Sequence, residues 1–229
     1  MEKTKHQLLK VLVGSRAHGL AKEDADYDYR GVYIIATKDL VSMGYKYKGV
    51  SWVEGETEDQ TSYELANFLN LAMQGHPNIL EMLVVPNIEE TNFVTGDNEE
   101  LQKLFPYIWS PEKAYTSFMN YANNRRKNMF NAENHEVAIK SAYCHIRVLY
   151  NLVQLLTHNT FSLEVKNEYI KKTLKEIKAG LWTDGQVIDL GRTLEIQASV
   201  LLDTCPHKQD EQLIKDYLVN MRKAYWILP

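Results

Sequence analysis

The spacing of apolar residues changes near Thr61, and this change limits the chain to a fold with two different parts. From Leu8 to about Val53, aliphatic and aromatic residues form short runs that end at turn residues, which is typical of β-strands. Beyond Thr61 they recur at i, i+3, i+4 and i+7, the spacing that places apolar side chains on one side of a helix. The sequence therefore predicts an α+β protein with a small mixed region followed by an all-helical part.

Three strands are expected in the first part, at Leu8–Val13, Tyr27–Ile35 and, more briefly, Val50–Val53. The second of them is the most informative. Because side chains alternate between the two faces of a strand, Asp26 and Asp28 are expected on one face of it.

Seven helices are predicted after Thr61. The third opens with Ser110 as its N-cap and a proline in its first turn. The predicted helices are Leu65–Met73, Ile79–Val84, Ser110–Arg126, Glu136–Leu156, Lys166–Lys178, Gln186–Asp203 and Gln209–Tyr225. An irregular, acidic stretch from Pro86 to Phe105 separates the second helix from the third. We therefore predict a domain boundary between Pro86 and Ser110, written as 1–100 for the first domain and 101–229 for the helical one.

Charge and composition narrow the classes of function. The 229 residues carry 26 Lys and Arg against 30 Asp and Glu, a net charge of −4, so any contact with nucleic acid must be local. Cys144 and Cys205 form no CxxC pair and no disulfide framework, which suits a reducing compartment. No apolar run is long enough to span a bilayer. These features predict a soluble cytoplasmic protein that makes no use of a membrane.

The residues that indicate a chemical function lie between Gly14 and Gly31. Gly14 and Ser15 follow the first predicted strand, and a Gly-Ser turn that enters a short helix directs N–H groups and a hydroxyl at one point, as a phosphate site requires. Asp26 and Asp28 place two carboxylates on one strand face, and hard divalent cations such as Mg²⁺ prefer carboxylate oxygens. A phosphate site beside metal-binding acids predicts phosphoryl transfer.

This arrangement resembles the nucleotidyltransferases of the DNA polymerase beta superfamily, whose signature is Gly-Ser followed by Asp-x-Asp. The longer string GSRAHGLAKEDADYDYRGVY resembles one branch, the RNA repair pathway polymerase beta family of predicted nucleotidyltransferases. Similar blocks surround Asp59, the His76-Pro77-Asn78 turn with Glu81, and the segment from Lys140 to Arg147. The resemblance implies a minimal polymerase-beta-like core, a mixed sheet with helices, followed by the helical half.

The resemblance also implies roles for individual residues. Gly14 and Ser15 would bind the phosphates of a nucleotide, with Ser15 on the β- and γ-phosphates, while Asp26 and Asp28 would hold two Mg²⁺ ions, or Mn²⁺ in their place. Asp59 best matches the third catalytic and metal-binding acid of the superfamily, although several glutamates lie close to it in the sequence. Two metals that stabilise both the attacking and the leaving oxygen explain why such a site gathers three acids.

Three basic residues are candidates for contacts with the nucleotide. Arg16 could bind a phosphate or form an ion pair with the nearby acids, and the sequence favours neither. Lys140 and Arg147 lie on the side of their helix opposite its apolar residues, where basic side chains are normally solvated. Only the resemblance makes these two candidates for binding a triphosphate or an RNA backbone.

The leading hypothesis is a Mg²⁺-dependent transferase that moves a nucleoside monophosphate from an NTP, ATP first, to a hydroxyl acceptor and releases pyrophosphate. The resemblance makes an RNA or tRNA 3′ end the expected acceptor. One alternative is AMP transfer to a protein or a small molecule. A second is a non-catalytic module that senses nucleotide or acts as an antitoxin-like partner. The sequence leaves the oligomeric state open.

Overall fold

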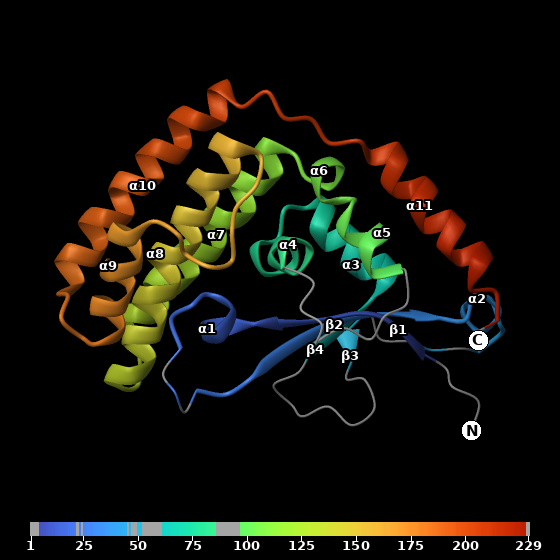
Figure 1. Ribbon diagram of the computed structural model, residues 1–229, viewed down its shortest axis with the longest axis horizontal. Helices are drawn as coiled ribbons and strands as arrows, with labels where there is room; N and C mark the ends of the chain where they lie inside the picture. The colour runs from blue at the N-terminus through green and yellow to red at the C-terminus, as the bar shows by residue number, and fades with distance from the viewer. Residues whose placement is uncertain are drawn as a thin grey trace.

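The computed structural model describes residues 5–21, 23, 25–44, 46, 50–51, 61–85 and 97–227. A sheet forms one layer, and helices lie over one of its faces and extend beyond it on one side (Figure 1). The described chain begins in the sheet, continues into the helices above it and returns, through α11, to the end of the sheet (Figure 1). The fold is α+β, as predicted, with an all-helical C-terminal half.

The sheet has four strands in the described residues, β1 (Lys5–Val13), β2 (Asp28–Ile35), β3 (Val50–Ser51) and β4 (Thr61–Glu64). Their spatial order is β1-β2-β4-β3. The β1–β2 and β3–β4 pairs are antiparallel, whereas β2 and β4 run parallel, so the sheet is mixed. The two central strands are therefore β2 and β4.

The pairing of β1 with β2 brings the end of one strand to the start of the other. Val13 is the last residue of β1 and lies opposite Asp28, the first residue of β2. Alternate residues of β1, including Val11 and Val13, are buried beneath the helices, as are Val32 and Ile34 of β2. This apolar face fixes the register, because a slip by one residue would turn the apolar side chains away from the core.

The helices vary widely in length, and those of the C-terminal half are the longest. They are α1 (Gly14–Ala17), α2 (Thr37–Leu40), α3 (Leu65–Met73), α4 (Pro77–Val84), α5 (Asp97–Gln102), α6 (Phe105–Ile108), α7 (Pro111–Phe130), α8 (His135–His158), α9 (Glu168–Lys178), α10 (Asp184–Thr204) and α11 (Glu211–Ala224). Side-chain caps define several N-termini. Ser110, for example, accepts a hydrogen bond from Lys113 N at the start of α7.

The structure confirms all seven predicted helices to within a few residues, and α3 has the predicted bounds. It also contains elements that the sequence did not predict. Strand β4 is only four residues long, and three of these residues are polar, namely Thr61, Ser62 and Glu64. It forms a strand because it pairs with β2. Helix α5 lies within the stretch predicted to be irregular, and its Leu101 is fully buried. Tertiary contacts, rather than local sequence pattern, specify these short elements.

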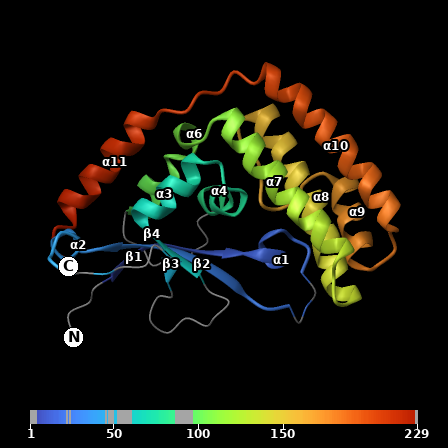
Figure 2. The ribbon, with the colours of Figure 1, turned by 180° about the vertical axis from the view of Figure 1, so that it is seen from behind.

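The C-terminal helix α11 is attached to the sheet at the C-terminal ends of the central strands β2 and β4. Backbone Thr37 N donates to Tyr225 O at 2.9 Å, and the Thr37 hydroxyl donates to Arg222 O at 2.7 Å. Arg222 Nη2 also donates to Glu64 Oε1 at 2.5 Å, and the other oxygen of Glu64 caps α3 through Ala66 N. In the view from behind, α11 descends to α2 on one side while α10 packs with α7 and α8 on the other (Figure 2).

One continuous hydrophobic core joins the sheet to the helices. It extends from Leu8 of β1 through Phe68 of α3 and Leu149 of α8 to Met221 of α11. The domain boundary predicted at residues 100 and 101 lies within α5 and stays a prediction. Among the helices that the structure describes, none has both the length and the apolar composition needed to cross a bilayer.

Candidate active site at the Gly-Ser turn

The Gly-Ser turn and Asp28 lie in direct contact. Gly14 begins α1 with φ +73°, in the left-handed region that glycine adopts most readily. A Cβ atom added to Gly14 would overlap Asp28 Oδ2 and lie 3.1 Å from Asp28 Cγ. The Asp28 carboxylate therefore occupies the space that a side chain at position 14 would fill. The antiparallel pairing of Val13 with Asp28 produces this contact.

Backbone hydrogen bonds hold the turn after Gly14 in a compact shape. His18 N donates to Gly14 O at 3.2 Å, and Leu20 N donates to Ser15 O at 3.0 Å. The turn is also attached to the helical half, because Val165 N donates to His18 O at 3.4 Å. Ser15 is partly exposed, next to the Gly14–Asp28 contact.

The three predicted metal-binding acids differ in what the structure shows of them. Asp28 is partly buried at the start of β2, whereas Asp26 is exposed and precedes the strand instead of lying on its face as expected. Within the described part of the chain, neither Asp26 nor Asp28 forms an ion pair. Asp59 lies outside the described residues, and among those described no group of three His, Cys, Asp or Glu gathers at a metal-binding spacing.

Arg16 binds the backbone of the segment that leads to the acids. Its Nε donates to Ala25 O at 2.8 Å, and its Nη2 donates to Ala25 O at 2.5 Å and to Glu23 O at 3.0 Å. Its guanidinium carbon also lies 4.0 Å from the ring centroid of Tyr27. Of the two alternatives left open for Arg16, an ion pair with the acids is not formed among the described residues.

Lys140 and Arg147, the basic residues predicted on the polar side of α8, have different environments. Lys140 is exposed. Arg147 is only 4% exposed, so the expectation of a solvated polar face is wrong at this position. Helix α8 packs against α7, α9 and α10 (Figure 1), and from Ser141 to Leu156 most of its residues are buried. Whether either residue contacts a nucleotide stays a prediction.

Arg147 belongs to a buried polar cluster that joins the turn to the helices. We define the buried quartet as His18, Glu81, Tyr143 and Arg147, each 6% exposed or less. Arg147 Nη1 donates to Glu81 Oε1, and His18 Nδ1 lies 2.9 Å from the Tyr143 hydroxyl. Lys178 of α9 adds a hydrogen bond of 2.8 Å to Leu20 O. The quartet therefore links the segment after α1 with α4 and α8.

Burial and charge determine the protonation states in the quartet. Burial, assisted by the Arg147 guanidinium, lowers the pKa of His18 to about 4. Burial alone would raise the pKa of Glu81, but Arg147 and His18 outweigh it and hold that pKa well below its usual range. His18 is therefore neutral at pH 7, and the 3.9 Å between its Nε2 and Glu81 Oε2 is no ion pair at that pH. The ion pair of the quartet is Arg147 with Glu81.

The sequence did not predict this quartet as a unit. Its members come from three segments that are far apart in the chain, and only the fold brings them together. The one available signal was that each lies in a block with family resemblance, namely the Gly-Ser motif, the turn containing Glu81, and the segment from Lys140 to Arg147.

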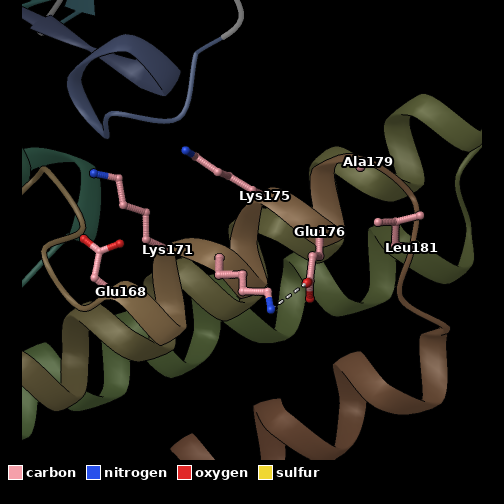
Figure 3. A pocket seen from close by; sticks show the side chains of 7 residues that line it. Glu168, Lys171, Lys175, Glu176, Ala179 and Leu181 are labelled. Carbon is pink, nitrogen blue, oxygen red and sulfur yellow. Dashed lines mark ion pairs between the residues drawn. The ribbon is translucent and has the colours of Figure 1, made fainter.

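A separate open hollow lies on α9. It has a volume of about 570 Å³ and is lined by Glu168, Lys171, Lys172, Lys175, Glu176, Ala179 and Leu181. Lys171 and Lys175 extend toward the blue ribbon of the N-terminal part, whereas Lys172 pairs with Glu176 at 3.8 Å (Figure 3). None of the residues that line this hollow belongs to the Gly-Ser turn or the acid pair.

Comparison with known proteins now decides the family. Residues 1–180 match the RNA repair pathway DNA polymerase beta family. The chain belongs to this family. The uncharacterized protein YcgL of Bacillus subtilis (strain 168) is 25% identical to it over 191 residues, which cover 82% of this chain and 71% of that protein. No solved structure matches the chain.

Membership of the RNA repair pathway DNA polymerase beta family agrees with the fold described above. The α+β core followed by a helical half is the architecture expected of a polymerase-beta-like protein. The matched region ends at residue 180, just after α9. The Gly-Ser turn, the acid pair and the buried quartet therefore all lie within the matched part, and α10 and α11 lie beyond it.

The contact between Gly14 and Asp28 predicts a large and specific effect of Gly14→Ala. Gly44 has φ +81°, but within the described part of the chain no atom lies within 4 Å of an added Cβ, so Gly44→Ala isolates the backbone strain, about 1–2 kcal/mol. Gly14→Ala should destabilise by a further 1–3 kcal/mol, roughly the cost of overpacking. Urea unfolding of both variants measures the difference. Equal losses would mean that the Asp28 carboxylate does not occupy this space.

The low pKa of His18 predicts that stability begins to fall below pH 6.5, where the carboxylates are still ionised. Between pH 6.5 and about 4, the His18 side chain binds a proton in the unfolded chain but not in the folded protein. The free energy of unfolding therefore falls as the pH falls. The loss across this window should be about 3 kcal/mol, from 1.36 kcal/mol per pKa unit.

Unfolding by urea at several pH values measures this loss. His76, His145 and His207 also have lowered pKa values, so the comparison is with His18→Gln, in which only the contribution of His18 is removed. The variant should show a smaller loss between pH 6.5 and 4 than the parent protein. The same loss in both proteins would contradict a neutral, buried His18.

Proposed function

We propose that this protein is a metal-dependent nucleotidyltransferase, which transfers a nucleoside monophosphate from an NTP to the 3′-hydroxyl of an RNA and releases pyrophosphate. ATP is the nucleotide to test first. The support comes from family membership, since residues 1–180 match a family described by an RNA repair pathway and by polymerase beta. The geometry of the Gly-Ser turn adds an independent argument.

The contact between Gly14 and Asp28 is the observation that carries the proposal. A phosphate-binding turn and a metal-binding acid function together only if they lie side by side, because a cation held by the acid would then neutralise charge on the bound phosphates. In this fold the Asp28 carboxylate lies against the Cα of Gly14, the residue before Ser15. The Gly-Ser turn and the Asp-x-Asp pair are thus in contact, although Gly14 and Asp28 are separated by 14 positions in the sequence.

The residues present fit a hard divalent cation. Asp26 and Asp28 offer carboxylate oxygens, which suit Mg²⁺ and Mn²⁺, and neither is paired with a cation among the described residues. We propose Asp59 as the third acid, since β4 begins two residues after it and runs parallel to β2. When bound, the cations would neutralise charge on the phosphates and activate the attacking hydroxyl.

The side chains of the turn would hold the substrate. The Ser15 hydroxyl, on the residue after Gly14, would donate to the β- and γ-phosphates, and in-line attack on the α-phosphorus would then expel pyrophosphate. Asp59 would also accept the proton of the attacking hydroxyl. Arg147 is a candidate for a phosphate contact only after a rearrangement of α8, because it is buried against Glu81, whereas Lys140 is exposed and needs no such change.

A label-transfer experiment tests the proposal. The protein is incubated with Mg²⁺ and with ATP, GTP, CTP or UTP labelled at the α- or the γ-phosphate, together with short RNAs. One set of RNAs ends in a 3′-hydroxyl, and the matched control set ends in a 3′-phosphate that cannot accept a nucleotide. We expect α-label on the first set alone, with release of pyrophosphate.

The other outcomes identify the alternatives. The α-label on protein or on a small molecule would indicate a different acceptor for the same chemistry. Nucleotide binding without turnover would favour a sensing or antitoxin-like module. Transfer of the γ-label would indicate a kinase-like reaction and would contradict the proposal.

A further inference from the structure

We propose that Arg16 is a positioning residue, which shapes the segment carrying Asp26 so that the two acids can bind a metal together. This inference deepens the proposed function and rests on it for the identity of the site. It assigns Arg16 a role different from both the phosphate contact and the ion pair that the sequence left open. The argument starts from the contacts of the guanidinium group.

Three hydrogen bonds join Arg16 to the backbone ahead of the acids. Nε and Nη2 both donate to Ala25 O, at 2.8 and 2.5 Å, and Nη2 also donates to Glu23 O at 3.0 Å. Ala25 is the residue directly before Asp26. A planar guanidinium can bind two carbonyl oxygens at a fixed angle, so it determines the direction in which the chain enters Asp26.

An aromatic contact fixes the other side of Asp26. The Arg16 guanidinium lies over the ring of Tyr27 at 4.0 Å, and Tyr27 stacks on Tyr29 with ring planes 12° apart. Lys10 lies over the Tyr29 ring at 5.0 Å. Arg16 therefore contacts the residue before Asp26 and the residue after it. Both contacts hold a segment that no strand pairing supports, since β2 begins only at Asp28.

Arg16 lies on α1, the same short helix that contacts Asp28. Arg16 is two residues after Gly14, whose backbone contacts the Asp28 carboxylate. The same short helix thus sets the place of Asp28 through Gly14 and the path of the chain at Asp26 through Arg16. Partners that orient metal ligands typically change metal affinity 10- to 100-fold when they are removed.

The direction in which Arg16→Ala changes metal affinity distinguishes a positioning role from a purely electrostatic one. A positive charge near two carboxylates repels a cation, so if Arg16 acted through its charge alone, Arg16→Ala would tighten metal binding. If Arg16 positions Asp26, the same variant weakens metal binding. Arg16→Lys keeps the charge but cannot reproduce the planar fork, so positioning predicts that it also weakens binding.

The test measures Mn²⁺ binding to the full chain by electron paramagnetic resonance, without nucleotide. We expect the dissociation constant for Mn²⁺ to rise about tenfold in both Arg16→Ala and Arg16→Lys. Guanidinium ion at millimolar concentration should partly restore binding to Arg16→Ala. Arg126→Ala, which removes a part-exposed arginine of α7, is the matched control and should leave Mn²⁺ binding unchanged. Thermal unfolding of each variant shows that it is folded.

Kinetics then separate this role from a phosphate contact. With saturating Mg²⁺, Arg16→Ala should have a KM for ATP within about twofold of the parent, because positioning of a metal ligand is compensated by metal excess. Unchanged or tighter Mn²⁺ binding, or a loss confined to the KM for ATP, would overturn the inference. If the parent protein binds Mn²⁺ in the predicted way but transfers no label, the proposed function fails and the positioning role stands.

Discussion

Asp28→Asn should lower nucleotidyl transfer about 10³-fold, because it replaces a metal-binding carboxylate by a neutral amide of the same shape. The amide still fills the space above Gly14, so the packing of the turn is preserved. A missing ligand costs several kcal/mol of transition-state stabilisation, and 1.36 kcal/mol corresponds to a tenfold change in rate. Label transfer to RNA at saturating ATP and Mg²⁺ measures the loss.

Stability provides the control for this variant. Asn has the same shape as Asp, and Asp28 forms no ion pair within the described part of the chain, so Asp28→Asn should unfold at about the same temperature as the parent. Asp189→Asn, on an exposed position of α10, makes the same chemical change away from the site and should retain full activity. Normal activity of Asp28→Asn would remove Asp28 from the catalytic site.

The largest expected effect on stability comes from Arg147→Met. This change leaves the Glu81 carboxylate, with a side chain 4% exposed, buried without its cation. Breaking a buried ion pair by removing one partner costs about 3–5 kcal/mol. In a chain of this length, such a loss lowers the midpoint of thermal unfolding by about 10 °C. Calorimetry or urea unfolding measures it.

A double variant distinguishes the charge from the packing. Arg147→Met with Glu81→Met removes both charges, and apolar replacement of a buried pair is often neutral, so most of the loss should be recovered. Arg126→Met breaks a more exposed pair with Glu195, at 3.4 Å, and should cost less than about 1 kcal/mol. If the double variant is no more stable than Arg147→Met, lost packing and not the unpaired carboxylate explains the effect.

The long helices and the sequence motif could be predicted because each depends on local information. Helix α3 was predicted with its observed bounds, since its apolar spacing and the following Gly75 and Pro77 define both its face and its end. The Gly-Ser and Asp-x-Asp elements were likewise visible as short patterns. Their contact through Gly14 and Asp28 needs only the antiparallel pairing of two predicted strands.

The features that escaped prediction depend on contacts between distant segments. Arg147 was expected on a solvated face because helical spacing separates it from the apolar residues of α8. The fold covers that face and places Glu81 against it. The bonds of Arg16 to the carbonyl groups of Glu23 and Ala25 leave no sequence pattern, because any residue type has a carbonyl. Strand β4 exists through its pairing with β2.

The most direct measurement of the central claim is a crystal structure with Mn²⁺ and a non-hydrolysable ATP analogue, in which the anomalous scattering of manganese locates the metal. We expect manganese on the carboxylates of Asp26 and Asp28, with the β- and γ-phosphates against Gly14 and Ser15. Phosphates bound elsewhere, or a metal that touches neither aspartate, would contradict the account.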